Sequence, residues 1–221
     1  MMGKREALHA ILNGQRADRI PVIMNAFSLP VARYGYTMAQ VMQQPDKMVE
    51  CMVGTRRQLG YDGLCLGVYS GITRQIAGHL PNSEGKIVGD GDDVIHSFED
   101  IKKLKEFHVK KCPWLEKMKY MIDRMREEEP DEPIYVIVHT PSSVAFTLMG
   151  AKPAFKAMVK NQDLYKELER VVEDAVVESC NKLIMELIFY GSQCLISVDT
   201  VYQENHMKHV YRKVIFGQIK G

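Results

Sequence analysis

Residues 133–150 read PIYVIVHTPSSVAFTLMG, in which a short apolar run passes directly into a second apolar pattern. Positions 134–138 are all apolar, so both faces of a strand here would be apolar, as a parallel strand covered on both faces requires. His139 stands where this strand stops, and the sequence TPSS after it opens a helix. Open α/β sheets and β/α barrels bind ligands at the carboxyl ends of their parallel strands. The segment from His139 to Ser143 is therefore the first candidate site.

Further apolar runs predict three more strands, at 20–24, 62–68 and 194–198. Helical patterns separate these runs, and such alternation favours a parallel sheet with right-handed crossovers. Four strand–helix units are half of an eight-stranded barrel, and a complete barrel takes about 250 residues. We therefore predict an α/β fold of the (β/α)8 TIM-barrel type, of which the chain holds the N-terminal half to two-thirds. An open sheet of four or five strands is the alternative.

The chain is predicted to form one domain, residues 1–221, with a helical extension at 1–19 and a divergent basic tail at 201–221. Apolar spacing predicts helices over 4–13, 37–59, 113–128 and 163–189. A polar stretch at 78–98 predicts a long loop with a short hairpin.

Several local signals mark the ends of the predicted helices. Thr37 is a predicted N-cap, a break is expected at Gln44-Pro45, and Gly60 ends that helical stretch. Ser97 begins another helix, since Asp100 three residues later completes a Ser-x-x-acid capping pattern.

Composition excludes several classes of function. The chain has 221 residues, of which 46% are hydrophobic, enough for a substantial core. Lys and Arg number 29 against 28 for Asp and Glu, so no global field attracts nucleic acid or an anionic membrane. Five widely spaced cysteines without C-x-x-C fit reduced thiols in the cytoplasm. No signal peptide and no membrane span of about 18 apolar residues is evident.

Polar residues after the predicted strands are the candidates for chemistry. His139 would polarise or deprotonate a substrate, given a reference pKa of about 6.5. The alternative is a histidine bonded to backbone at a barrel rim. Asp199 would anchor a polar group of the substrate or a metal-bound ligand, and the alternative is an N-cap of the following helix. The predicted substrate-binding residues are Asn25, Tyr69, Ser70 and Ser142.

Other residues that often bind metals or react are weaker candidates. Cys65 and Cys194 lie inside apolar strands, where a buried, unreactive thiol is expected. His206 and His209 have a spacing that places two imidazoles on one helical face, but no third ligand is evident. The sequence by itself therefore assigns no metal ligand.

Three stretches together resemble the uroporphyrinogen decarboxylase superfamily, in particular its cobamide-dependent methyltransferase branch. Residues 5–22, REALHAILNGQRADRIPV, resemble the entry helix and first strand of that family. Residues 140–150, TPSSVAFTLMG, resemble its Gly-Pro-Phe-Thr-Leu-Ala segment, and the stretch from Lys160 to Thr200 resembles a long helix leading to a strand with an acidic end. Family members are complete barrels with the site in the mouth. The resemblance implies that this chain is truncated after about Thr200.

The resemblance also bears on the reaction. Decarboxylases of the superfamily carry an Arg-Gln-Ala-Gly-Arg segment after the first strand, and paired guanidinium groups suit the carboxylates of a porphyrinogen. Here residues 25–30 read NAFSLP, with Arg33 the only nearby arginine, and Tyr69 and Ser70 replace an acidic residue after the second strand. Porphyrinogen decarboxylation is thus poorly matched.

The methyltransferase branch implies transfer of a methyl group from a corrinoid (cobalamin), carried by a partner protein, to a thiol or similar acceptor. Relatives use zinc to activate the thiol as thiolate, through ligands in their C-terminal half that have no counterpart here. Two alternatives stay open: a uroporphyrinogen-type decarboxylase (a lyase), and a non-catalytic remnant that associates with a partner half or with itself as a homo-oligomer.

Overall fold

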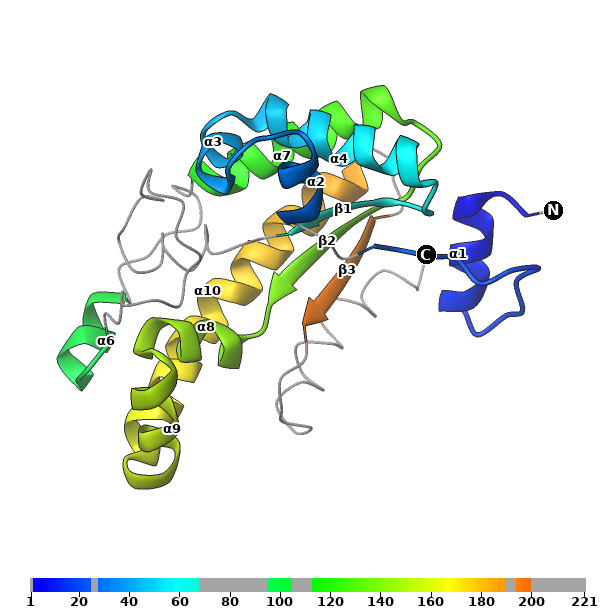
Figure 1. Cartoon of the computed structure of the whole chain (residues 1–221). Helices are drawn as coiled ribbons and strands as arrows, with labels where there is room; N and C mark the ends of the chain where they lie inside the picture. The colour runs from blue at the N-terminus through cyan, green and yellow to red at the C-terminus, as the bar shows by residue number, and fades with distance from the viewer. Residues whose placement is uncertain (1, 25–27, 68–94, 105–112, 190–193, 200–221) are drawn as a thin grey trace.

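Three parallel strands form the sheet around which the described helices are arranged (Figure 1). The structure, a computed structural model, describes residues 2–24, 28–67, 95–104, 113–189 and 194–199. In chain order the elements are α1 (Lys4–Leu12), α2 (Ser28–Arg33), α3 (Met38–Gln43), α4 (Pro45–Leu59), β1 (Leu64–Gly67), α6 (Phe98–Leu104), α7 (Pro113–Glu128), β2 (Ile134–His139), α8 (Pro141–Met149), α9 (Ala151–Lys160), α10 (Gln162–Phe189) and β3 (Cys194–Asp199).

The strands lie in the order β1-β2-β3, so each strand is hydrogen-bonded to the next one in the sequence. Leu64 is the register partner of Ile134, and Ile134 is in turn the partner of Cys194. Both pairs are parallel, and described helices lie in each connection, α6 and α7 between β1 and β2 and α8, α9 and α10 between β2 and β3. This order confirms the predicted strand–helix alternation, because sequential parallel neighbours joined by helices are the repeat of a β/α barrel.

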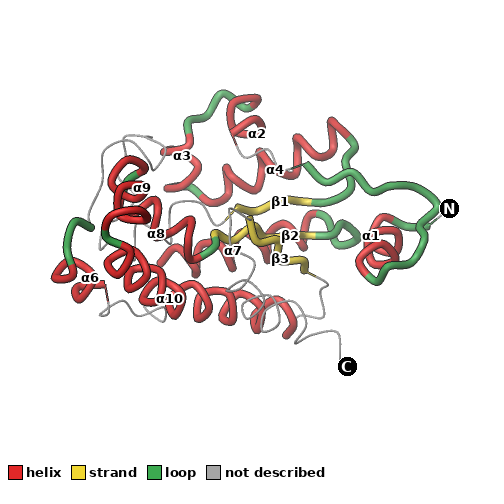
Figure 2. The backbone as a smooth tube through the Cα atoms, turned by 90° about the horizontal axis from the view of Figure 1, so that it is seen from below, coloured by secondary structure: helices red, strands yellow, loops and turns green. Residues whose placement is uncertain are grey.

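Both faces of the sheet are covered, which explains why the side chains on both faces of β2 are apolar. Leu64, Leu66 and Val136 belong to a large core that they share with α4, α7 and α10. On the opposite face, Tyr135 and Ile137 form a second, smaller cluster with Cys65. Figure 2 shows α4 beside β1, and α10 running along the side of the sheet where β3 lies.

The predicted helix ends are confirmed by their hydrogen bonds. The Thr37 hydroxyl accepts from the backbone N–H of Gln40, and the Gln40 side chain accepts from the N–H of Thr37. Pro45 occupies the first turn of α4, which separates α4 from α3 as expected. Gly60 ends α4 with a φ of 74°, a left-handed conformation that favours glycine.

The start of α6 is also as predicted. The hydroxyl of Ser97 donates to the Asp100 carboxylate at 2.8 Å and accepts from the N–H of Asp100 at 3.3 Å. Two short helices, α2 and α9, were not predicted, and each carries a proline in its first turn. A proline there is compatible with a helix, but it weakens the periodic signal that a sequence pattern gives.

The prediction of a strand at 20–24 was wrong: these residues form no strand in the structure. The segment is instead joined to the start of β1 through Asp62, whose N–H donates to the Val22 carbonyl at 2.7 Å and whose carboxylate accepts from the Val22 N–H at 2.9 Å. Pro21 has no N–H to give to a ladder, and Ile20 and Val22 are 82% and 60% exposed. One backbone hydrogen bond and one bond to the Asp62 carboxylate therefore replace regular strand pairing.

The hairpin predicted within 78–98 falls largely outside the described residues. Across the described ranges, no helix has the length and hydropathy needed to span a membrane.

Candidate active site

The two residues predicted to carry the chemistry are neighbours across the sheet. His139 is the last residue of β2, Asp199 is the last residue of β3, and the two are register partners. Register partners in adjacent parallel strands stand side by side on the same face of a sheet. The structure therefore brings both positions, which are 60 residues apart in the sequence, to one point at the carboxyl edge.

The junction after His139 is a rigid turn from strand to helix. Thr140 is buried, its backbone is extended, and its hydroxyl accepts a hydrogen bond from the N–H of Ser143 at 3.1 Å. Pro141 then occupies the first turn of α8, where its missing N–H costs nothing. An N-cap and a proline in succession leave the end of β2 little freedom, which suits a residue that has to be held in place.

Ser142 lies in the same turn and is bound to the helical layer. Its hydroxyl donates to the Glu169 carboxylate of α10 at 2.6 Å, and its carbonyl accepts from the Tyr165 hydroxyl at 3.4 Å. Burial raises the pKa of Tyr165 to about 12, so this phenol remains a neutral donor at neutral pH. The described contacts of Ser142 thus join α8 to α10, and a contact with substrate stays a prediction.

The other predicted site residues are not in the described part of the chain. Asn25, Tyr69 and Ser70 lie outside it, as do His206 and His209. Cys65 is buried at 4% exposure, as expected for a thiol inside an apolar strand, and burial raises the pKa of this thiol to about 11.

Sequence reasoning placed Thr140 in the candidate segment without assigning it as the N-cap, and it missed Glu169. The pattern Thr-Pro-Ser-Ser at a strand end is an N-cap signal, so the sequence does carry the information that identifies Thr140 as the cap. Glu169 carries no comparable signal, because its contact with Ser142 joins residues that are far apart in the sequence.

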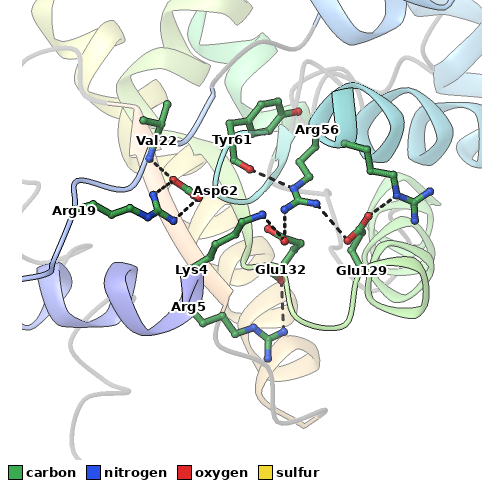
Figure 3. Close-up of polar contacts among 10 residues, drawn as sticks. Lys4, Arg5, Arg19, Val22, Arg56, Tyr61, Asp62, Glu129 and Glu132 are labelled. Carbon is green, nitrogen blue, oxygen red and sulfur yellow. Dashed lines mark hydrogen bonds and ion pairs between the residues drawn. The ribbon is translucent and has the colours of Figure 1, made fainter. Parts of the chain in front are cut away.

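A second polar cluster lies at the opposite, amino-terminal end of the sheet (Figure 3). Arg19 donates two hydrogen bonds to the carboxylate of Asp62, at 2.6 and 2.7 Å. Asp62 comes just before β1, and its carboxylate also holds the N–H of Val22. Because the amino-terminal face of a β/α barrel serves stability rather than catalysis, we interpret this cluster as structural.

The same end of the sheet holds a buried arginine. Arg56 is 8% exposed and forms ion pairs with Glu132, which comes just before β2, and with Glu129 at 3.5 Å. Lys4 of α1 adds a contact to Glu132 at 2.7 Å, and Arg56 donates to the Tyr61 carbonyl at 3.2 Å. These contacts fasten α1 and α4 to the loops that lead into β1 and β2.

The pair between Arg19 and Asp62 predicts a pH dependence of stability. The hydrogen bonds from Arg19, and then the Val22 N–H, lower the pKa of Asp62 against the opposing effect of burial. A carboxyl group whose pKa is lower in the folded state stabilises the fold above its unfolded pKa of about 4, and this contribution is lost as the pH falls toward the folded pKa. Arg19→Gln is therefore expected to lower the free energy of unfolding at neutral pH.

Urea unfolding of Arg19→Gln and of the unaltered chain, followed across the acidic range, checks this expectation. The difference in free energy between the two proteins should shrink as the pH falls from about 4 toward the lower folded-state pKa of Asp62, and it should vanish once Asp62 is protonated in both folded proteins. A difference that stays constant over the whole range would show that Arg19 acts through packing alone.

The family resemblance implies zinc, held by ligands that have no counterpart in this chain, and the described residues likewise offer no such site. Within the described ranges no three residues among His, Cys, Asp and Glu are grouped as metal ligands. Three protein ligands are the usual minimum for zinc in an enzyme.

Comparison with known proteins places the sheet and helices in context. The family model for uroporphyrinogen decarboxylase (URO-D) matches residues 3–217. A solved structure of a methyltransferase from Methanosarcina mazei is similar with a TM-score of 0.65 at 16% sequence identity, covering 98% of this chain and 65% of that chain. This chain therefore spans about two thirds of the length of that structure. A search of curated proteins found no match.

The two matches agree with the described topology. A likeness at this identity shows the fold alone, and the fold is of the TIM-barrel type that the sequence predicts; how much of a barrel the chain completes stays a prediction. The family match extends from α1 to beyond β3 and so includes the whole described sheet. The chain belongs to the uroporphyrinogen decarboxylase (URO-D) family.

Proposed function

We propose that this chain transfers a methyl group from a corrinoid, carried by a partner protein, to a thiol or a similar nucleophile. The observation that carries the proposal is the pairing of His139 with Asp199 at the carboxyl edge of the sheet. In β/α barrels this edge is where catalytic residues gather. The fold likeness to a methyltransferase supports the same reading.

In this proposal His139 is the general base. A thiol is a poor nucleophile until it loses its proton, and an imidazole with a pKa near neutral is well suited to accept that proton. Asp199 beside it would stabilise the imidazolium that forms. The corrinoid, when its carrier is bound, supplies the methyl group. The S–H bond breaks, a new S–C bond forms, and the electron pair of the broken methyl bond stays with the donor.

The decarboxylase alternative gains little from the described residues. A porphyrinogen site needs guanidinium groups that face the ligand. Arg33 is the one arginine close in sequence to the segment that carries these groups in decarboxylases, and it donates to the Gln58 side chain of α4 at 2.6 Å. Its guanidinium is thus engaged with a neighbouring helix.

A methyl-transfer assay with free methylcobalamin and a panel of small thiols tests the proposal. The expected result is a methyl thioether, detected by mass spectrometry, together with loss of the methylcobalamin absorbance at the same rate. A parallel incubation with uroporphyrinogen, followed by porphyrin chromatography, tests decarboxylation. Decarboxylation without methyl transfer would contradict the proposal. Inactivity of a folded chain in both assays, with and without zinc, would favour the non-catalytic remnant.

A further inference from the structure

Helix α9 exposes apolar and basic side chains together. Phe155 is 63% exposed, Met158 is 38% exposed and Val159 is 76% exposed. The exposed residues of the same helix also include its three lysines, Lys152, Lys156 and Lys160. Single apolar residues on a surface are ordinary, but a group on one short helix needs a reason.

The packing of α9 does not supply that reason. Its buried residues are Ala154 and Ala157, on the side that meets α8 and α10. Phe155 meets the ring of Phe146 edge-to-face at 5.1 Å, yet most of its surface remains in water. The ring is thus held in one position without being buried. A fixed aromatic ring loses little conformational entropy on binding, which suits an anchor in an interface.

The lysines of α9 are also unexplained by the fold. The helix contains no Asp or Glu, and within the described ranges none of its three lysines forms an ion pair. Lysines elsewhere do, as Lys4 does with Glu132 and Lys102 with Glu99. Lys152 lies in the first turn, where the helix dipole disfavours a cation. Lys160 lies in the last turn, where the helix dipole favours a cation, so Lys152 and Lys156 are the two lysines that contribute nothing to the helix itself.

The location of α9 connects this surface with the candidate active site. Helix α8 begins two residues after His139, and α9 follows α8 with only Gly150 between them. Figure 1 shows α8 and α9 beyond the carboxyl end of β2. A molecule bound to α9 would thus sit at the same end of the sheet as His139 and Asp199.

We propose that the exposed face of α9 docks a protein partner whose contacting surface is acidic and carries apolar side chains. Interfaces of this kind have a few apolar anchors at the centre and charged residues at the rim, which steer association and set specificity. Phe155 and Val159 would be the anchors, and the lysines would meet the acidic groups. The inference concerns a binding surface and does not depend on the proposed methyl transfer.

A membrane surface is a weaker match for this helix. Helices that lie in a bilayer interface present a broad apolar face to the lipid. The small residues on the apolar side of α9, Ala154 and Ala157, are already packed against α8 and α10. The exposed apolar residues that remain are few and lie among lysines.

Two synthetic helical peptides of equal length and charge provide the test. One carries Glu and Leu on a single face, and the other carries Glu with Ser in place of each Leu. Fluorescence anisotropy with the full chain should show binding of the Glu/Leu peptide, weakened by salt. The double variant Lys152→Glu/Lys156→Glu and the single variant Val159→Ser should each weaken this binding about 10-fold or more. Lys102→Glu on α6 is the matched control and should bind like the unaltered chain.

Each outcome decides the proposal. Recovery of binding between the double lysine variant and a peptide with Lys in place of Glu would support it strongly. Equal binding of the Leu and Ser peptides would show that binding depends on charge alone, without apolar anchors, and would overturn the proposal. Binding to vesicles of phosphatidylcholine and phosphatidylglycerol, lost in the same variants while neither peptide binds, would assign α9 to a membrane instead. Circular dichroism of every variant shows whether the fold is retained; Val159, at 76% exposure, is the substitution least able to disturb it.

Discussion

Replacement of His139 by alanine is expected to lower the rate of methyl transfer by about 10²- to 10⁴-fold, the range that a positioned general base contributes. The reason lies in its place at the end of β2, next to Asp199, in a junction fixed by the Thr140 cap and Pro141. Steady-state measurement of kcat and KM with methylcobalamin and a thiol gives the answer. The loss should appear in kcat, because proton removal belongs to the chemical step.

The pH profile separates a base from a residue that only supports the fold. Without His139, the reaction depends on thiol that has ionised by itself, so the rate of the variant should rise with pH toward the thiol pKa of about 8.5. His96→Ala is the matched control, since His96 is exposed and the contact described for it is that of its backbone N–H with Asp100. Full activity of His139→Ala would remove the general base from the proposal.

A double-mutant cycle of His139 and Asp199, measured by kcat in the same assay, tests whether the two residues act together. Asp199→Asn should lower kcat less than His139→Ala does, and should shift the acidic limb of the pH profile downward, because a neighbouring carboxylate favours the charged imidazole. If the two residues act as a unit, the double variant should be little worse than His139→Ala alone. Strictly additive losses would show that the register partners act separately.

The second large effect is expected at the other end of the sheet. Glu132→Ala is expected to lower the free energy of unfolding by about 3 kcal/mol, near the lower end for a broken buried ion pair. Arg56 cannot give up its proton, so it would be left charged in a site where it is 8% exposed. Glu129 and the Tyr61 carbonyl remain as partners, which moderates the loss.

Chemical unfolding at neutral pH measures this loss, with Glu127→Ala as the control. Glu127 pairs with Arg124 on the exposed side of α7, and removal of such a pair should leave stability unchanged within error. Glu132→Gln keeps the shape and should cost less than alanine, since burial already raises the pKa of Glu132 against the effect of Arg56. Equal stability of Glu132→Ala and the unaltered chain would show that Arg56 finds water or another partner.

The two predictions concern opposite ends of the sheet: His139→Ala is expected to affect activity, and Glu132→Ala is expected to affect stability. The carboxyl edge has a short, fixed junction and two polar residues brought into register, whereas the amino edge has guanidinium and carboxylate groups that satisfy one another. Charged groups that already pair with one another contribute to the stability of the folded state. The division agrees with β/α barrels in general, where one end carries the chemistry and the other the stability.

The sequence by itself determined the local elements with strong signals. The apolar run before His139 predicted β2, Thr37 and Ser97 predicted helix starts, and Gly60 predicted a helix end, because each effect acts within a few residues. The order of several motifs determined the family. Tertiary structure decided what sequence neighbours cannot: that residues 20–24 attach through Asp62 and not through a ladder, that Arg56 pairs with Glu132, and that His139 and Asp199 are register partners. Each of these depends on register and burial between distant segments, which no local pattern encodes.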